Sequence, residues 1–178
     1  PTLRIQAIDM KVHNFNSGPS ILPQTVMEQA AQAIHDFNGT GLSILEIGHR
    51  TNHFQEVLQE AINSVKQLMD LGDEHEVLFL HGGATTQFMQ VPMNLLDENA
   101  TAAYHVNGIW GKKAAAEAAL FGKVEVVADS ADKQNTYISK DFAVPTSAAY
   151  LHITSNNTVE GTQWHQFPET QVPLVADM

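Results

Sequence analysis

The sequence predicts an α/β fold, in which helices cover both faces of a mostly parallel sheet. Strand-like and helix-like segments alternate between residues 76 and 128, beginning and ending with a strand, and such alternation is typical of parallel sheets with helical connections. The strand-like segments are also mostly apolar, as strands are when both faces of the sheet are covered. A chain of 178 residues is long enough to bury a core of this kind.

The amino-terminal part is expected to contain an arm and two helices. Residues 1–22 are interpreted as an extension and arm, and Pro23 suits the first turn of a helix that runs to about Phe37. Thr51 is the expected N-cap of a second helix that Gly72 ends. The apolar residues of this second helix recur at helical spacing and are expected to pack in the core. They are Phe54, Leu58, Ala61, Ile62, Val65, Leu68 and Met69.

Residues 23–178 are predicted to form one domain, and its second part holds the sheet. Strands are expected at 76–81, 101–106, 123–128, 149–154 and 172–178, and helices at 85–95 and 110–121. Ligands of such sheets bind beyond the carboxyl ends of the strands. Residues that directly follow these strands are therefore the first candidates for a functional site.

Composition narrows the range of functions. A net charge of −11 and a pI near 5.1 leave no broad basic surface for nucleic acid or for an anionic membrane. The chain has no cysteine and no apolar stretch of membrane-spanning length, which favours a cytoplasmic protein without disulfides. His49 and His53 are the only histidines four residues apart, and they lack the glutamate of a zinc helix, so we expect no metal site.

A glycine-rich turn after the strand at 76–81 is the main candidate binding element. It reads His81-Gly82-Gly83-Ala84-Thr85-Thr86 and runs into a helix. Glycines permit a tight turn, and the free backbone N–H groups at a helix start favour an anion. We interpret Ala84 and Thr85 as part of a phosphate cradle. The other interpretation is an ordinary turn in which the glycines serve only its sharpness.

Three further residues follow strands on the same predicted edge of the sheet. Trp110 could stack on a flat heteroaromatic ring, or fill the layer between sheet and helix. Thr158 could bond a ring hydroxyl, or satisfy its own backbone in a turn. Asp177 ends the strand at 172–178, which places a carboxylate where it can meet a ring nitrogen.

Arg50 is one of only two arginines and lies just before the second helix. This position suits a guanidinium that binds a carboxylate or phosphate of a ligand. The alternative is a surface arginine that pairs with Glu46 or Glu56.

Six short motifs occur in the order and spacing of one known family. They lie at 15–19, 48–50, 81–88, 107–110, 156–161 and 175–177. Through them, the stretch from Met10 to Met178 resembles the amino-terminal half of the phosphoserine aminotransferases. The resemblance implies part of the large domain of a fold-type I transferase that depends on pyridoxal 5′-phosphate. It also implies transfer of the amino group from L-glutamate to 3-phosphooxypyruvate, giving O-phospho-L-serine and 2-oxoglutarate, in L-serine and pyridoxine biosynthesis.

The resemblance also implies roles for individual residues. Ala84 and Thr85 would hold the cofactor phosphate, Trp110 would stack on the pyridine ring, and Thr158 would bond the ring oxygen. Asp177 would pair with the protonated ring nitrogen, which allows the ring to act as an electron sink. Ser17, His49 and Arg50 would contact the substrate, with Arg50 binding its carboxylate.

The family's Schiff-base lysine lies shortly beyond the position of Asp177, and the sequence ends at Met178. The chain is therefore expected to contain no catalytic residue of its own and to be inactive by itself. It is also expected to be cytoplasmic, to form a homodimer and to associate with a complementary carboxyl-terminal chain. Two alternatives stay open: another fold-type I aminotransferase or lyase, and a non-catalytic anion-binding α/β module. A lysine soon after Asp177 in the native gene would favour the enzymes.

Overall fold

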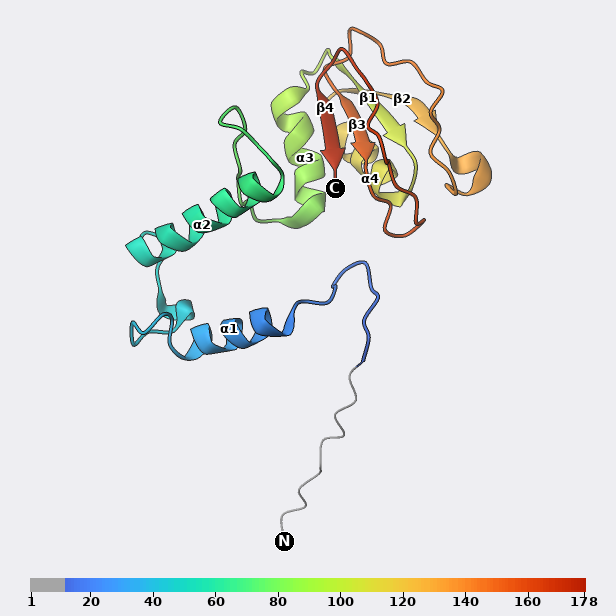
Figure 1. The fold of residues 1–178 in the computed structure, drawn as a ribbon. Coiled ribbons are helices and arrows are strands. Elements are labelled where there is room, and N and C mark those ends of the chain that lie inside the picture. The colour runs from blue at the N-terminus through green and yellow to red at the C-terminus, as the bar shows by residue number, and fades with distance from the viewer. Residues whose placement is uncertain (1–11) are drawn as a thin grey trace. The chain divides into compact units, whose positions relative to one another are not determined.

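The computed structural model describes residues 12–178, so residues 1–11 of the predicted extension lie outside the described part. The chain divides into two compact units, 1–79 and 80–178, and each is described by itself (Figure 1). The division falls inside the stretch 23–178 that the sequence predicts as one domain.

The first unit contains two helices, both close to their predicted positions. Helix α1 spans Gln24–His35 with Pro23 at its N-cap, and a short 3-10 helix, η1, spans Ile44–Glu46. Helix α2 spans Asn52–Leu68, and the Thr51 hydroxyl oxygen accepts a hydrogen bond from Phe54 N at 3.4 Å. This confirms Thr51 as the N-cap. The helix ends before Gly72, because Asp70 adopts a left-handed conformation with φ 53°.

The apolar stripe of α2 does not form a core among the described residues, and this prediction was wrong for them. No residue of α2 is buried, and the Leu68 side chain is 86% exposed. In the described part of the first unit only Phe37 is buried. Two helices and their loops offer too little apolar surface to cover the stripe.

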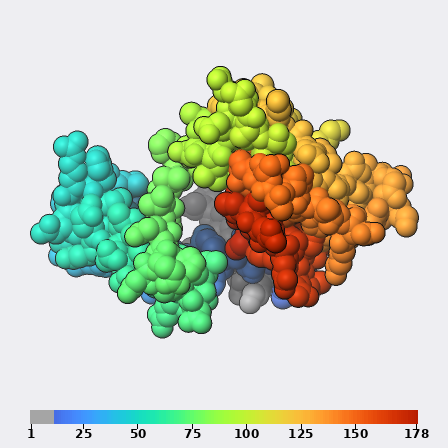
Figure 2. Space-filling view, turned by 90° about the horizontal axis from the view of Figure 1, so that it is seen from above, coloured from blue at the N-terminus to red at the C-terminus, as the bar shows by residue number. Residues whose placement is uncertain are grey.

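The second unit contains a parallel sheet of four strands, which are four of the five strands that the sequence predicts. The strands are β1 Thr101–Val106, β2 Lys123–Asp129, β3 Leu151–Thr154 and β4 Leu174–Asp177. Their spatial order is β2-β1-β3-β4, and every neighbouring pair is parallel. Strand β4 therefore forms one edge of the sheet among the described residues, and Figure 2 shows it at the surface in red, beside the orange residues of the preceding segment.

The predicted strand at 76–81 is absent. Residues 75–80 form no regular secondary structure and pair with no strand of the described chain. The side chains of Leu78, Phe79 and Leu80 are 72%, 56% and 59% exposed. A β-strand requires a hydrogen-bonded neighbour, and no neighbour for this segment exists between residues 12 and 178.

Helices α3 (Gly83–Leu95) and α4 (Ile109–Ala118) cover one face of the sheet. Phe88, Ala114 and Ala118 of these helices pack with Tyr104 and Tyr150 of the sheet side. The opposite face is covered by connecting segments, whose Phe142 and Trp164 pack on strand residues such as Ala103 and Leu151. The sequence predicts helices on both faces of the sheet, but within this unit the helices cover one face only.

The strand order identifies the end of the sheet where a ligand is expected. The chain passes from β1 to β2 on one side and then returns to β3 on the other side of β1. A reversal of this kind opens a crevice beyond the carboxyl ends of the two central strands. Figure 1 shows the arrowheads of β3 and β4 pointing to the end of the unit where α3 begins. No helix between residues 12 and 178 has both the length and the apolar character needed to cross a membrane.

Candidate functional site

Trp110 and Thr158 meet beyond the carboxyl ends of β1 and β3. Trp110 lies in the first turn of α4, and its indole Nε1 donates a hydrogen bond to Thr158 Oγ1 at 3.1 Å. The Lys113 ammonium lies 4.5 Å from the centre of the indole ring. Part of the indole packs against the core, as the packing interpretation expects, and stacking on a heteroaromatic ring stays a prediction.

The hydrogen bond from Trp110 determines which further hydrogen bonds the Thr158 hydroxyl can form. Its hydroxyl oxygen serves as an acceptor for the indole N–H, so the alternative in which it only satisfies its own backbone is not what the structure shows. A hydroxyl that accepts one hydrogen bond keeps its proton for donation to another acceptor. Thr158 is exposed, and that proton is available to a ligand.

Asp177 lies at the carboxyl end of β4, as predicted, in register with Thr154 of β3. Partial burial raises the pKa of its carboxyl group, because desolvation disfavours the charged form. No salt bridge to this carboxylate is present among residues 12–178. The side chain is thus suited to a cationic partner, whose charge would offset the loss of water.

The predicted phosphate cradle has the local geometry for an anion. Gly82 and Gly83 adopt positive φ angles of 102° and 65°, which glycine alone adopts readily. Gly82 is the N-cap of α3 and offers no side-chain acceptor to the first turn. A Cβ atom at Gly82 would lie 2.5 Å from Thr86 Oγ1, which also shows why the position is small. Ala84 and Thr85 are exposed, so this helix start is accessible from solvent.

The three predicted substrate residues belong to the first unit. Ser17 lies in a bend, and His49 and Arg50 lie in the turn before α2; all three are exposed. The His49 carbonyl accepts a hydrogen bond from Gln55 Nε2 at 3.0 Å. Arg50 forms no salt bridge with Glu46 or Glu56, so its guanidinium is not engaged as the alternative interpretation expects. Trp110 and Thr158 are therefore in contact within the second unit. The three predicted substrate residues lie in the first unit.

Sequence reasoning missed two residues near the site. His152 of β3 is buried, stacks on Tyr104 with ring centres 4.8 Å apart, and contacts Phe88 edge-on. Burial lowers its pKa to about 4, so the imidazole is neutral near pH 7. Its place in an apolar strand was the available signal. Glu160 contacts the start of α4, 51 residues away in sequence, and no local pattern could have indicated that contact.

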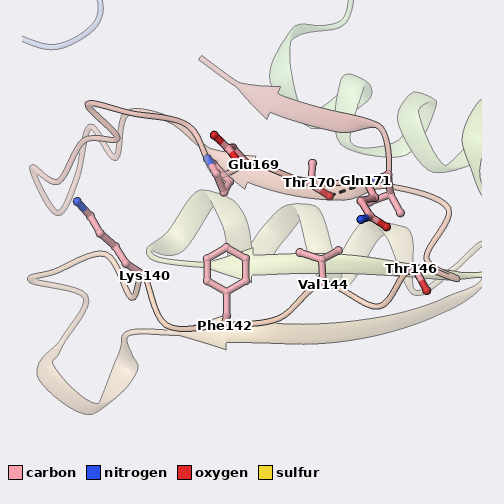
Figure 3. Close-up of a pocket in the computed structure, with 9 residues that line it drawn as sticks. Lys140, Phe142, Val144, Thr146, Glu169, Thr170 and Gln171 are labelled. Carbon is pink, nitrogen blue, oxygen red and sulfur yellow. Dashed lines mark hydrogen bonds between the residues drawn. The ribbon is translucent and has the colours of Figure 1, made fainter.

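The cavities of the second unit do not coincide with the full set of site residues. A cavity of about 660 Å³ lies between the segments 140–146 and 168–172 and contains none of the predicted site residues. Figure 3 shows Phe142 and Val144 pointing from one segment toward the other. A second cavity of about 420 Å³ lies beside the start of α4 and includes Gly108 and Glu160. The candidate site is therefore defined by the positions of its side chains, since an open edge of a sheet encloses no cavity.

Comparison with protein families shows the family of this chain. A family model described as aminotransferase class-V matches residues 12–172. The chain belongs to the class-V aminotransferase family. A phosphoserine aminotransferase from Phocaeicola vulgatus is 51% identical over 169 residues, and one from Syntrophobacter fumaroxidans is 49% identical over 170 residues. These matches cover 95% and 94% of this chain but 47% of each relative, so the chain spans about half the length of the curated relatives it matches.

Solved structures of class-V aminotransferases share the fold. A phosphoserine aminotransferase from Bacillus circulans subsp. alkalophilus superposes with a TM-score of 0.90 at 42% identity, over 94% of this chain and 47% of that one. A phosphoserine aminotransferase from Trichomonas vaginalis, described as bound to pyridoxal phosphate, has a TM-score of 0.85 at 29% identity, over 93% of this chain and 47% of its own. The fold class predicted from the sequence is thereby confirmed, including its resemblance to pyridoxal-phosphate-dependent transferases.

Proposed function

We propose that this chain is the amino-terminal, cofactor-binding part of a phosphoserine aminotransferase. The observation that carries the proposal is the arrangement of Trp110, Thr158 and Asp177 beyond the carboxyl ends of β1, β3 and β4, in a chain about half identical to named phosphoserine aminotransferases. Pyridoxal 5′-phosphate is the cofactor that these groups fit.

In this proposal, different residues would bind different groups of the cofactor. The first turn of α3, with Ala84 and Thr85, offers uncapped N–H groups to the phosphate. The Trp110 indole offers a flat face to the pyridine ring, and the free proton of Thr158 can be donated to the ring oxygen.

Asp177 supplies the electrostatic part of the mechanism. When it is bound, the cofactor provides an electron sink for the reaction at the substrate's α-carbon. The Asp177 carboxylate would stabilise a proton on the ring nitrogen, because paired opposite charges favour each other's charged forms at a desolvated position. The pairing would offset the effect of desolvation, which raises the carboxyl pKa in the absence of a partner.

Substrate binding is assigned to the first unit in this proposal. Arg50 would bind a carboxylate of L-glutamate or 3-phosphooxypyruvate, with Ser17 and His49 nearby in the assembled enzyme. The complete enzyme would be a cytoplasmic homodimer that includes the family's Schiff-base lysine, supplied by sequence beyond Met178 or by a complementary chain. The exposure of all three side chains is consistent with this role.

The proposal is tested by replacing Asp177 in the complete enzyme. We expect Asp177→Ala to lower the rate of amino transfer from L-glutamate to 3-phosphooxypyruvate by roughly 100-fold or more, as when one essential electrostatic contact of a transition state is removed. The matched control is Asp141→Ala, since Asp141 is exposed and lies outside the site. Both variants should retain the fold by circular dichroism. Full activity in Asp177→Ala, or no such activity in the unaltered enzyme, would contradict the proposal.

A further inference from the structure

The first turn of α4 is capped by a side chain from a distant segment. Gly108 is the N-cap and has no side chain to offer, and Ile109 N donates a hydrogen bond to Glu160 Oε1 at 2.8 Å. The N–H groups at a helix start lack partners within the helix and favour a negative charge. Glu160 therefore connects the loop that follows β3 to the beginning of α4.

This connection is close as well as charged. A Cβ atom at Gly108 would lie 2.6 Å from both Asn157 Oδ1 and Glu160 Oε2, so the loop packs directly against the glycine backbone. Both oxygen atoms are buried and have no hydrogen-bond partner. The bond to Ile109 N is thus the one hydrogen bond that the Glu160 carboxylate forms among the described residues.

The same two segments carry Trp110 and Thr158. Trp110 directly follows Ile109, and Thr158 precedes Glu160 by two residues. Two hydrogen bonds therefore join the segments: Ile109 N donates to Glu160 Oε1, and Trp110 Nε1 donates to Thr158 Oγ1. We propose that Glu160 is a positioning residue, which fixes the Trp110 indole and the Thr158 hydroxyl relative to each other by holding the loop against α4.

Other contacts of Trp110 cannot replace this function. Lys113 lies over the indole but belongs to the same helix, so it moves with Trp110 and does not fix the loop. The bond between Trp110 and Thr158 joins two neutral groups, and Thr158 is exposed to competing water. A bond from an N–H group to a carboxylate is shorter and stronger than a neutral one. Glu160 is therefore the firmer of the two connections.

A consequence for cofactor binding follows, and this part rests on the proposed function. If Trp110 stacks on the ring and Thr158 bonds its oxygen, both groups must keep their separation when the ring arrives. Glu160 sets that separation before binding, so the affinity for pyridoxal 5′-phosphate depends on a residue that does not touch it.

The first experiment tests the positioning without cofactor. The complete protein is labelled with 5-fluorotryptophan, and the Trp110 line in the fluorine NMR spectrum is assigned by its loss in Trp110→Phe. We expect Glu160→Ala to shift or broaden this line, whereas Glu160→Gln should largely restore it because its amide oxygen can accept the same hydrogen bond. The control Glu98→Ala changes an exposed glutamate in the turn before β1 and should leave the line unchanged.

Trp164 gives an internal check of folding, since it is buried against the opposite face of the sheet. Its line should stay in place in all of the glutamate variants. An unchanged Trp110 line in Glu160→Ala, with the Trp164 line also unchanged, would overturn the positioning role. If Glu160→Ala unfolds, the Trp110 line in Glu160→Gln decides. A Trp110 line at the position of the unaltered protein supports the role of Glu160, and a line at the position of the unfolded chain overturns it.

The second experiment titrates pyridoxal 5′-phosphate into the same variants freed of cofactor. We expect the dissociation constant to rise about tenfold in Glu160→Ala, because a tenfold change corresponds to the free energy of about one hydrogen bond. The dissociation constant should recover at least in part in Glu160→Gln. An unchanged dissociation constant in Glu160→Ala would overturn the consequence for binding. No binding by the unaltered protein would contradict the proposed function, while the NMR result would still decide the role of Glu160.

Discussion

Burial disfavours the charged form of two titratable side chains in the second unit, His152 and Asp177. His152 is held neutral by burial, which lowers its pKa to about 4, and it packs between aromatic rings. Asp177 has a raised carboxyl pKa for the same physical reason, yet it lies at a strand end that a ligand can reach. Burial alone therefore does not distinguish a candidate site residue, whereas a position at the carboxyl end of a strand does.

The pKa of His152 predicts a dependence of stability on pH. In the unfolded chain a histidine titrates near its ordinary pKa of 6.5, whereas folded His152 binds its proton only near pH 4. The unfolded state therefore binds more protons between these values, and the free energy of unfolding falls as the pH is lowered from 6.5 to 4. We expect His152→Phe to flatten this fall in urea titrations at several pH values.

The comparison for His152→Phe is His165→Phe, because His165 is exposed. This control should keep the slope of the unaltered protein. Equal slopes in His152→Phe and the unaltered protein would show that His152 does not carry the pH dependence.

At the scale of the secondary-structure elements, the start of α4 depends on a glycine. Gly108 has extended backbone that any residue can adopt, so its importance comes from space: an added Cβ would lie 2.6 Å from both Asn157 Oδ1 and Glu160 Oε2. We expect Gly108→Ala to lower the free energy of unfolding by roughly 1–3 kcal/mol, the usual effect of overpacking. Thermal unfolding measures this change.

Gly48→Ala is the control for Gly108→Ala, since a Cβ there meets its nearest atom, Thr51 Cγ2, only at 3.9 Å. It should change the stability by less than half as much. A Gly108→Ala variant as stable as Gly48→Ala would mean that the loop moves aside freely.

Elements with local signals were predictable from the sequence, and those that depend on distant partners were not. The strand at 101–106 and the N-cap at Thr51 were predicted correctly. The alternation of strand-like and helix-like segments and the capping of a helix by threonine are both patterns among residues that are near one another in the sequence. The segment 76–81 has the apolar composition of a strand, but composition cannot supply the neighbour that pairing needs. The same limit applies to Glu160, whose contact with Ile109 N joins residues 51 positions apart.

At the scale of the whole molecule, apolar surface remains uncovered in both units. Leu68 and Leu78 in the first unit and Leu80 in the second unit are exposed. Apolar surface of this kind is more often covered by another chain or segment than left in water. We therefore expect the 178-residue chain, prepared alone, to form a dimer or larger assembly, measured by size-exclusion chromatography with light scattering.

The control for this measurement is the same chain with a complementary carboxyl-terminal chain added. Addition should replace any irregular assembly by one defined species, because the same apolar surface is then covered. A stable, well-folded monomer of 19.5 kDa at micromolar concentration would contradict the expectation.

Under the proposed function, the partly buried carboxylate of Asp177 would link the lifetime of the folded protein to the cell's supply of the cofactor. Without a cationic partner, the charged group opposes folding, since burial has removed water that nothing replaces. A pyridoxal ring whose nitrogen is protonated would supply that partner, and any ligand that binds only the folded state also stabilises it. Vitamin B6 supply would then set how much of this enzyme survives proteolysis, as well as how much of it can react.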